Sequence, residues 1–146
     1  MTPAQEIVQK HVEHVLGVPV TFGVNDCLPF AADLILELTG IDILGNRYRG
    51  AWTSENQGLS MIPLGMGTTM RRRMKELGWT KVDPFSAPVG SLALLRIWIE
   101  DANGIAKEIH EAGVVTGGMV VHRIEKGVGH AALRDVVFCW APPCQS

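Results

Sequence analysis

The chain has 146 residues, of which 47% are hydrophobic and 19% are charged, and its formal net charge is −2. This size and composition predict one domain with a hydrophobic core and exclude disordered and coiled-coil proteins. The charge balance also excludes a general nucleic-acid binder, which would carry a strong basic excess. The apolar stretches are far shorter than the ~20 residues that a membrane span needs.

The N-terminal residues 1–17 lack the basic start and apolar core of a signal peptide, so we expect no secretory leader. Three widely spaced cysteines argue against a disulfide framework and indicate synthesis in a reducing compartment. No His or Cys pair follows Cys139 and Cys144, so we predict neither a metal site nor a cofactor. Cys139 is instead expected in a buried strand, and Cys144 in a loose tail.

Apolar residues at helical spacing predict a first, amphipathic helix over residues 3–16, which Gly17 ends. Residues 40–67 are rich in loop signals. Another helix is predicted over residues 69–77 and ends at Gly78.

A central helix is predicted over residues 27–39, between these two. Asn25 or Asp26 can cap its start, Pro29 fits its first turn, and Gly40 ends it. Because its apolar residues lie on most sides, we expect this helix to be buried.

Short β-rich runs separated by glycine-containing turns make up the C-terminal part, at residues 91–99, 109–117, 119–125 and 135–141. Gly117 and Gly118 between two of these runs are typical of a two-residue hairpin turn. Helices come first and an antiparallel sheet follows, so the sequence predicts a single α+β domain over residues 1–146.

Five stretches occur here in the order found in one known superfamily: "FGVNDCLPFAADL", "TGIDILGNRYRGAW", "SAPVGSLALL", "AGVVTG" and "VVFCWAP". They resemble the phage and prophage branch of the NlpC-type, papain-like cell-wall cysteine peptidases. The first two stretches are fairly specific, and the last three are weak alone. The resemblance covers most of the chain from residue 22 on. It implies a compact NlpC-like fold, in which the cysteine-bearing helix packs on the C-terminal antiparallel sheet.

The resemblance also implies a place in the virion. Such proteins are encoded beside tail-tip components and are thought to act at the tail tip. The expected partners are therefore other phage tail-tip proteins, such as hub or distal tail components. The expected location is the tail tip of a virion made in the bacterial host cytoplasm.

Cys27, at the start of the central helix, is the candidate nucleophile. A thiol with a pKa of ~8.5 is only about 3% thiolate at pH 7. A helix N-terminus lowers that pKa by at most about 0.7 unit, and a charged Asp26 next door acts in the opposite direction. Cys27 therefore needs a histidine partner to become a strong nucleophile.

In the NlpC-type pattern, that histidine begins the second strand, two residues before a glycine. Here Glu111 takes this position before Gly113. A carboxylate beside a thiol disfavours the thiolate, so we expect this departure to disable the usual mechanism. His110 is adjacent, but side chains alternate along a strand, so it can serve only if the strand register differs.

A rewired site is the alternative. If Gly117 and Gly118 form a two-residue turn, Gly113 pairs with His122, and His122 shares a sheet face with Glu111. Cys27, His122 and Glu111 are then candidate nucleophile, base and orienting carboxylate. Otherwise, His122 is a polar residue on the sheet with no catalytic task.

Arg49 lies in one of the two more specific stretches. We expect its guanidinium to bond carbonyls and hold the long loop over the central helix, with substrate contact as the alternative.

Three functions follow from these observations. The favoured one is a tail-tip assembly component with a degenerate peptidase site, because Glu111 replaces the histidine and Ser91 stands where relatives often carry Asp. The second is an active cysteine peptidase or amidase that cuts peptidoglycan stem peptides during genome entry, which makes host peptidoglycan a partner. The third is a cellular acyl-transfer enzyme or hydrolase outside phages.

Overall fold

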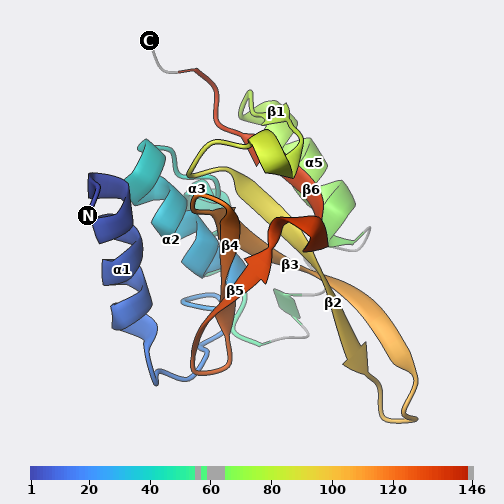
Figure 1. Ribbon diagram of the computed structural model, residues 1–146. Helices are drawn as coiled ribbons and strands as arrows, with labels where there is room; N and C mark the ends of the chain where they lie inside the picture. Colours follow the sequence, from blue (N-terminus) through green and yellow to red (C-terminus); the bar gives the residue numbers. More distant parts are fainter. Residues whose placement is uncertain (55–56, 59–64, 145–146) are drawn as a thin grey trace.

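The computed structural model describes residues 1–54, 57–58 and 65–144, which form helices and one antiparallel sheet (Figure 1). The helices are α1 (Pro3–Val15), α2 (Cys27–Thr39), α3 (Gly45–Tyr48) and α5 (Met66–Glu76). The strands are β1 (Thr80–Lys81), β2 (Leu92–Glu100), β3 (Ala106–Val115), β4 (Met119–Ile124), β5 (Gly127–Ala132) and β6 (Val136–Ala141), with short 3-10 turns η1 (Pro84–Ser86) and η2 (Leu133–Asp135). The sheet order is β1-β6-β2-β3-β4-β5. This arrangement confirms the α+β prediction at the level of mixed helices and antiparallel sheet.

Helix α1 begins with a reciprocal capping box. The Thr2 hydroxyl accepts a hydrogen bond from the Gln5 N–H at 3.1 Å, and the Gln5 side chain accepts one from the Thr2 N–H at 2.8 Å. Val15 near its end packs with Phe30 of α2, and Lys10 pairs with Glu37 at 2.6 Å. Helix α1 therefore lies along α2 and covers it, as the predicted amphipathic pattern requires (Figure 1). None of the helices in the described ranges combines the length and apolar composition that crossing a membrane requires.

Helix α2 has the predicted bounds, and Gly40 ends it in a left-handed conformation with φ +79°. Asp26 occupies the N-cap position, which is one of the two residues predicted for it, but its side chain makes no capping hydrogen bond. Its carboxylate accepts instead from the Gly23 N–H and the Trp52 indole N–H. The Asn25 side chain accepts from the Thr21 N–H instead. Both side chains stabilise the preceding loop, not the helix.

The sheet has apolar side chains on both faces. One face packs against α2 and includes Leu92, Leu94, Ala112 and Val114, which meet Leu28, Ala31, Ala32 and Ile35 of the helix. Full burial of one such leucine or isoleucine side chain contributes about 1.5–3 kcal/mol. The other face forms a smaller cluster of Ala93, Leu95, Val115, Val120 and Cys139. Cys139 is thus the predicted buried strand cysteine, and Cys144 is exposed.

The predicted hairpin turn at Gly117 and Gly118 is confirmed. The Thr116 N–H bonds the Met119 carbonyl at 3.0 Å, and Gly113 pairs with His122. Strands β1 and β5 were not predicted from the sequence, and α5 begins three residues earlier than expected. The loop-rich stretch over residues 40–67 contains the short helix α3 and lies partly outside the described residues.

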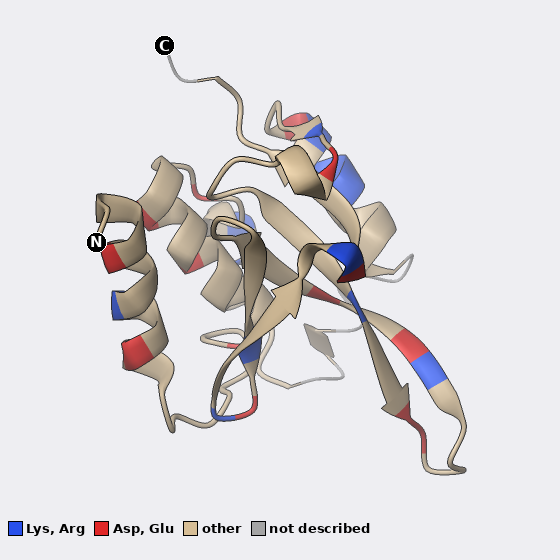
Figure 2. Cartoon of the chain, in the orientation of Figure 1, with Lys and Arg blue, Asp and Glu red and all other residues tan. Residues whose placement is uncertain are grey.

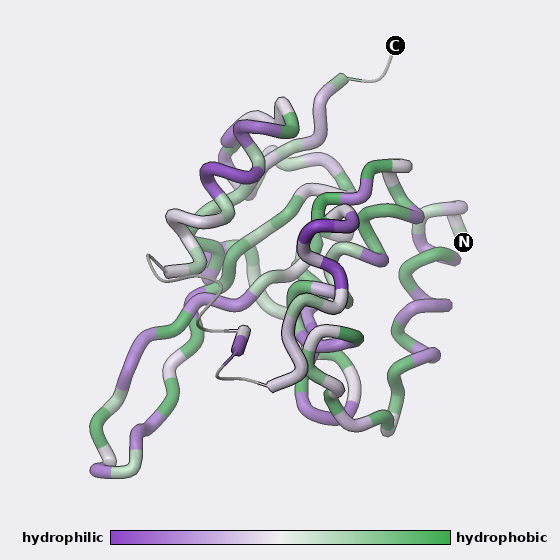
Figure 3. Tube along the Cα trace, turned by 180° about the vertical axis from the view of Figure 1, so that it is seen from behind, coloured by the Kyte–Doolittle hydropathy of each residue, from purple (hydrophilic) through white to green (hydrophobic). Residues whose placement is uncertain are grey.

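Strands β2 and β3 extend beyond the rest of the sheet. Strand β6 pairs with β2 only as far as Leu95, and β4 pairs with β3 only from Gly113. The part of this hairpin over residues 96–110, called the β2–β3 arm below, projects from the body of the domain in both views (Figures 1 and 3).

Candidate functional site

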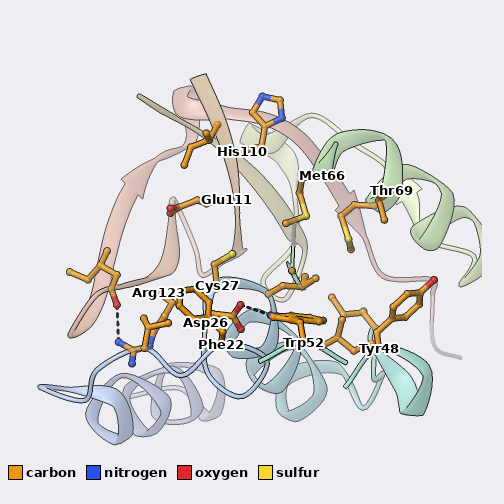
Figure 4. Close-up of a pocket in the computed structure, with 18 of the residues that line it drawn as sticks. Phe22, Asp26, Cys27, Tyr48, Trp52, Met66, Thr69, His110, Glu111 and Arg123 are labelled. Atoms are coloured by element: carbon orange, nitrogen blue, oxygen red, sulfur yellow. Dashed lines mark hydrogen bonds between the residues drawn. The ribbon is translucent and has the colours of Figure 1, made fainter. Parts of the chain in front are cut away.

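Cys27 lies in a groove of about 620 Å³ between α2, the loop before it, α3, α5 and the β2–β3 arm (Figure 4). Most of the lining is apolar, with Phe22, Leu28, Ile43, Trp52, Met66, Met70 and Ile109 among it. Asp26, Glu111, His110 and Arg123 supply polar groups. A mostly apolar groove with a few convergent polar groups is the usual form of a binding site, and it contains several of the residues predicted from the sequence.

The Cys27 thiol is held in its protonated form. Burial is the largest cause, and the carboxylates of Glu111 and Asp26 add to it, so that the pKa of the Cys27 thiol rises to about 12. Backbone hydrogen bonds from Ala112 and from Leu28, at the helix start, lower this pKa but are outweighed. With its pKa raised in this way, the thiol is ionised far less at neutral pH than an ordinary cysteine.

Glu111 and His122 lie together, as the hairpin register predicts. His122 Nδ1 is 3.6 Å from a Glu111 carboxylate oxygen, which is too long for a hydrogen bond. The Nδ1 atom is buried and has no hydrogen-bond partner among the described residues. The two side chains are therefore close, but no hydrogen bond fixes the imidazole for catalysis.

The His122 ring is packed into the sheet beside two glycines. His122 pairs with Gly113 on one side and with Gly129 on the other. A Cβ atom on Gly129 would lie 2.6 Å from His122 Nε2, so this nitrogen lies over β5. Cys27 lies on the opposite side of β4 from β5, where its thiol meets the Ala112 backbone of β3. The structure thus brings Glu111 to both His122 and Cys27, but His122 is not among the described residues that line the groove.

His110 lines the groove, but its ring lies away from Cys27 (Figure 4). The ring meets Phe138 edge-on at 6.3 Å between centroids, and Nε2 is 3.4 Å from the Glu108 carboxylate. The β2–β3 register runs without a shift past His110. Strand alternation therefore places His110 on the face of Ala112, which packs against α2, and the His110 ring lies away from the thiol because it is further out on the arm (Figure 4).

Asp26 and Trp52 fix the loop that precedes Cys27. The Asp26 carboxylate accepts from the Gly23 N–H at 3.1 Å and from Trp52 Nε1 at 2.8 Å. Burial is the main cause that raises the pKa of Asp26, and these hydrogen bonds act in the opposite direction. Asp26 therefore keeps the loop folded against Trp52, while its charge disfavours the thiolate.

Arg123 is a buried arginine that stabilises the loop of the site, and its role was not predicted from the sequence. Its residue surface is only 3% exposed, and burial lowers the pKa of its guanidinium. The guanidinium donates to four backbone carbonyls, those of Val18, Asn25, Ile124 and Gly127. It therefore ties the loop before Cys27 to the β4–β5 hairpin. A basic residue in the apolar run "MVVHRI" was the available signal.

Arg49 connects the region around α3 to α2. Its Nε and Nη2 atoms meet the Asp42 carboxylate at 3.0 and 2.9 Å, and Nη1 meets Asp33 of α2 at 2.6 Å. The expected carbonyl partners are thus replaced by two carboxylates. Arg49 holds this segment against α2, and the hydrogen bond from Arg49 is the main cause that lowers the pKa of Asp42.

We expect Arg49→Ala to lower the free energy of unfolding by about 1–2 kcal/mol at neutral pH, measured by urea titration. Because Arg49 lowers the pKa of Asp42, this stabilisation is present above the usual carboxyl pKa and is lost as pH falls through the folded-state value. The difference between variant and wild type should therefore shrink at pH 3. Arg72→Ala, which removes an exposed arginine of α5, is the matched control and should change little. An equal loss in both variants would contradict the prediction.

Across residues 1–54, 57–58 and 65–144, no group of three or more His, Cys, Asp or Glu side chains could hold a metal ion. A family model described as "Domain of unknown function (DUF6950)" matches residues 3–141, from the start of α1 to the end of β6. No curated protein and no solved structure matches the chain.

Proposed function

The chain belongs to the DUF6950 family, and we propose that it is an assembly component of a phage tail tip, built on an NlpC-like fold with a degenerate cysteine peptidase site. The observation that carries this proposal is the setting of Cys27, whose thiol is buried beside the carboxylates of Glu111 and Asp26 so that its pKa is raised to about 12. A cysteine peptidase needs the opposite shift, because the thiolate is the nucleophile. The phage setting is supported by the five NlpC-like stretches, and the fold by the position of Cys27 at the start of a helix that packs on an antiparallel sheet.

The groups around Cys27 support a degenerate peptidase site, in which no histidine is placed to act as the general base. An NlpC-type enzyme would have a histidine where Glu111 stands, and Glu111 raises the thiol pKa. His122 would have to direct Nε2 at the thiol while Glu111 held Nδ1, but Nε2 lies over Gly129. Neither the acid–base partner nor the charge needed for attack is therefore in position.

An assembly role does not require a reactive thiol. The groove keeps its apolar lining even though the chemistry is disfavoured. Such a surface suits contact with a neighbouring protein segment, since burial of apolar area drives association. The expected neighbours are tail-tip proteins, such as hub or distal tail components.

The pH dependence of Cys27 alkylation tests the degenerate site. In a Cys144→Ser background, we expect the iodoacetamide rate at Cys27 to keep rising beyond pH 10 without a plateau, because its pKa is near 12. Mass spectrometry of the Cys27 peptide separates this reaction from that of buried Cys139. The matching Cys27→Ser variant gives the background. If the alkylation rate at Cys27 instead rose with a midpoint at a pH below the ordinary thiol pKa of ~8.5, the proposal would be overturned.

The active peptidase or amidase remains the second candidate, because Glu111 and His122 do lie together beside the groove that holds Cys27. A digest of purified peptidoglycan with wild type and with Cys27→Ala separates the two functions. Stem peptides that are cleaved by wild type and not by the variant would establish the enzyme. Antibody labelling of purified phage particles tests the location, and labelling away from the tail tip would contradict the assembly role.

A further inference from the structure

The β2–β3 arm has an open edge along β2. Strand β6 covers β2 from Leu92 to Leu95, with a register shift after Leu94. Strand β3 covers the opposite side of β2 along its whole length. Among the described residues, β2 therefore has no neighbour on its β6 side from residue 96 to residue 100. The arm projects from the body in both views (Figures 1 and 3), and Arg96, Trp98 and Glu100 are exposed.

The hydrogen-bond pattern shows which backbone groups face the open edge. The Asp101 N–H bonds the Ile105 carbonyl, and the Val115 N–H bonds the Ser91 carbonyl, both at 3.0 Å. Residues of an antiparallel strand direct their backbone groups alternately to the two sides. Odd-numbered residues of β2 therefore face β3. Arg96, Trp98 and Glu100 direct their N–H and C=O groups to the open edge, as Leu92 and Leu94 do toward β6.

The side chains of this edge are unusually apolar for an exposed strand. Trp98 is 63% exposed and Ile99 is 42% exposed. Natural proteins protect open edges with proline, bulges or inward-pointing charges, because an unprotected edge pairs with another strand. Residues 96–100 contain no proline, and the β2–β3 register has no bulge there. The two charges of this stretch lie at its ends, with the basic residue near the body and the acidic residue near the tip (Figure 2).

The sequence of the edge, "RIWIE", is complementary to itself when two copies run antiparallel. With the two-fold axis at Trp98, Arg96 lies opposite Glu100 of the second copy at both ends. Ile97 lies opposite Ile99, and the two Trp98 residues face each other. The pairs of Arg96 with Glu100, at both ends, and of Trp98 with Trp98 join residues that face the open edge, so their N–H and C=O groups meet across it. Aromatic pairs and opposite charges directly across two strands both stabilise a sheet.

We propose that this edge of β2 is a dimer interface, at which a second copy of the chain pairs in antiparallel register centred on Trp98. The two arms then form a four-stranded sheet in the order β3-β2-β2-β3, with one two-fold axis. Within one copy, the Arg96 Nε meets Glu108 of β3 at 2.6 Å, so in the dimer the guanidinium would bridge Glu108 on one side of β2 and Glu100 of the second copy on the other. This interface does not depend on the tail-tip role, and of its residues Ile99 alone also lines the groove around Cys27 among the described residues.

Sedimentation of the full chain from low micromolar to near-millimolar concentration tests the interface. Wild type should form a concentration-dependent dimer. R96E alone, and E100R alone, set like charges opposite each other at both ends, so each should associate about tenfold or more weakly. An equimolar mixture of R96E and E100R should recover the dimer, since every reversed charge then faces its opposite. The double variant R96E/E100R should recover it as well.

K107E is the matched control, because it makes the same charge change on β3 of the arm and leaves the open edge intact. Thermal melts of all variants establish that they fold, and E100R leaves the Arg96–Glu108 contact in place. A wild type that stays monomeric at near-millimolar concentration would overturn the proposal and point to a strand of a different protein. A dimer that R96E and E100R leave unchanged, or a mixture that does not associate, would overturn it too.

Discussion

Arg123→Met should unfold at a free energy about 3 kcal/mol lower than wild type, as measured by urea titration at neutral pH. The guanidinium donates to four backbone carbonyls, at 2.6 to 3.0 Å, and methionine can donate to none of them. Each buried carbonyl left without a donor costs about 1–3 kcal/mol. Methionine also removes the free-energy cost of burying a positive charge, which offsets part of this loss. That cost is evident because burial lowers the Arg123 pKa.

The effect should be local to the loop that carries the site. Val18 and Asn25 lie in the loop before Cys27, so their release should speed amide hydrogen exchange there more than in α2. Arg134→Met, which makes the same change on an exposed residue of η2, is the control and should stay within about 0.5 kcal/mol of wild type. A loss below about 1 kcal/mol for Arg123→Met would mean that other contacts hold the loop.

Helix α2 could be predicted to the residue because its limits depend on local chemistry. Pro29 fits only the first turn, and Gly40 provides the left-handed conformation that ends the helix. The register of the hairpin was equally predictable, since a two-residue turn at Gly117 and Gly118 determines every pair beyond it. Both predictions depend on residues that are close in sequence.

Arg123 could not be predicted because its partners are distant in sequence. Asn25 is 98 residues away, and Val18 is 105 residues away. Arg123 stands next to His122 in an apolar strand, but the sequence does not show that the loop before Cys27 packs over this strand and buries the charge. The partner of the Asp26 side chain could not be predicted for the same reason: Asp26 is the N-cap residue of α2, but its carboxylate bonds Trp52, which is 26 residues further on.

The candidate site was predictable in part. Strand alternation brings Glu111 and His122 together, as the structure has it. The direction of the His122 ring depends on Gly129 of β5, which the sequence patterns did not reveal as a strand. Gly127 and Gly129 interrupt the apolar alternation of this strand, so the usual signal is weak. The roles of Cys27, His122 and Glu111 as nucleophile, base and orienting carboxylate stay predictions.

Gly23→Ala should be the second severe substitution, with a loss of more than about 3 kcal/mol in the free energy of unfolding. Gly23 has φ +81°, and a Cβ atom there would lie 1.9 Å from the Trp52 carbonyl oxygen. The obstacle is backbone, so no flexible side chain can move to relieve it. Either the loop before Cys27 or the segment at Trp52 must shift, and the Asp26 hydrogen bonds to Gly23 and Trp52 should weaken together.

Gly17→Ala separates the steric clash of a new Cβ atom from the strain of a left-handed backbone conformation, and it does so within the same loop. Gly17 has a similar φ of +74°, but a Cβ atom there would meet nothing within 4 Å. It should therefore lose only the conformational cost of about 1–2 kcal/mol. The Trp52 indole N–H resonance, which reports the bond to Asp26, should move in Gly23→Ala and stay in Gly17→Ala. Equal losses would mean that the Trp52 backbone yields freely, and the wall of the groove beside Cys27 would then be adaptable enough to admit partners of different shapes.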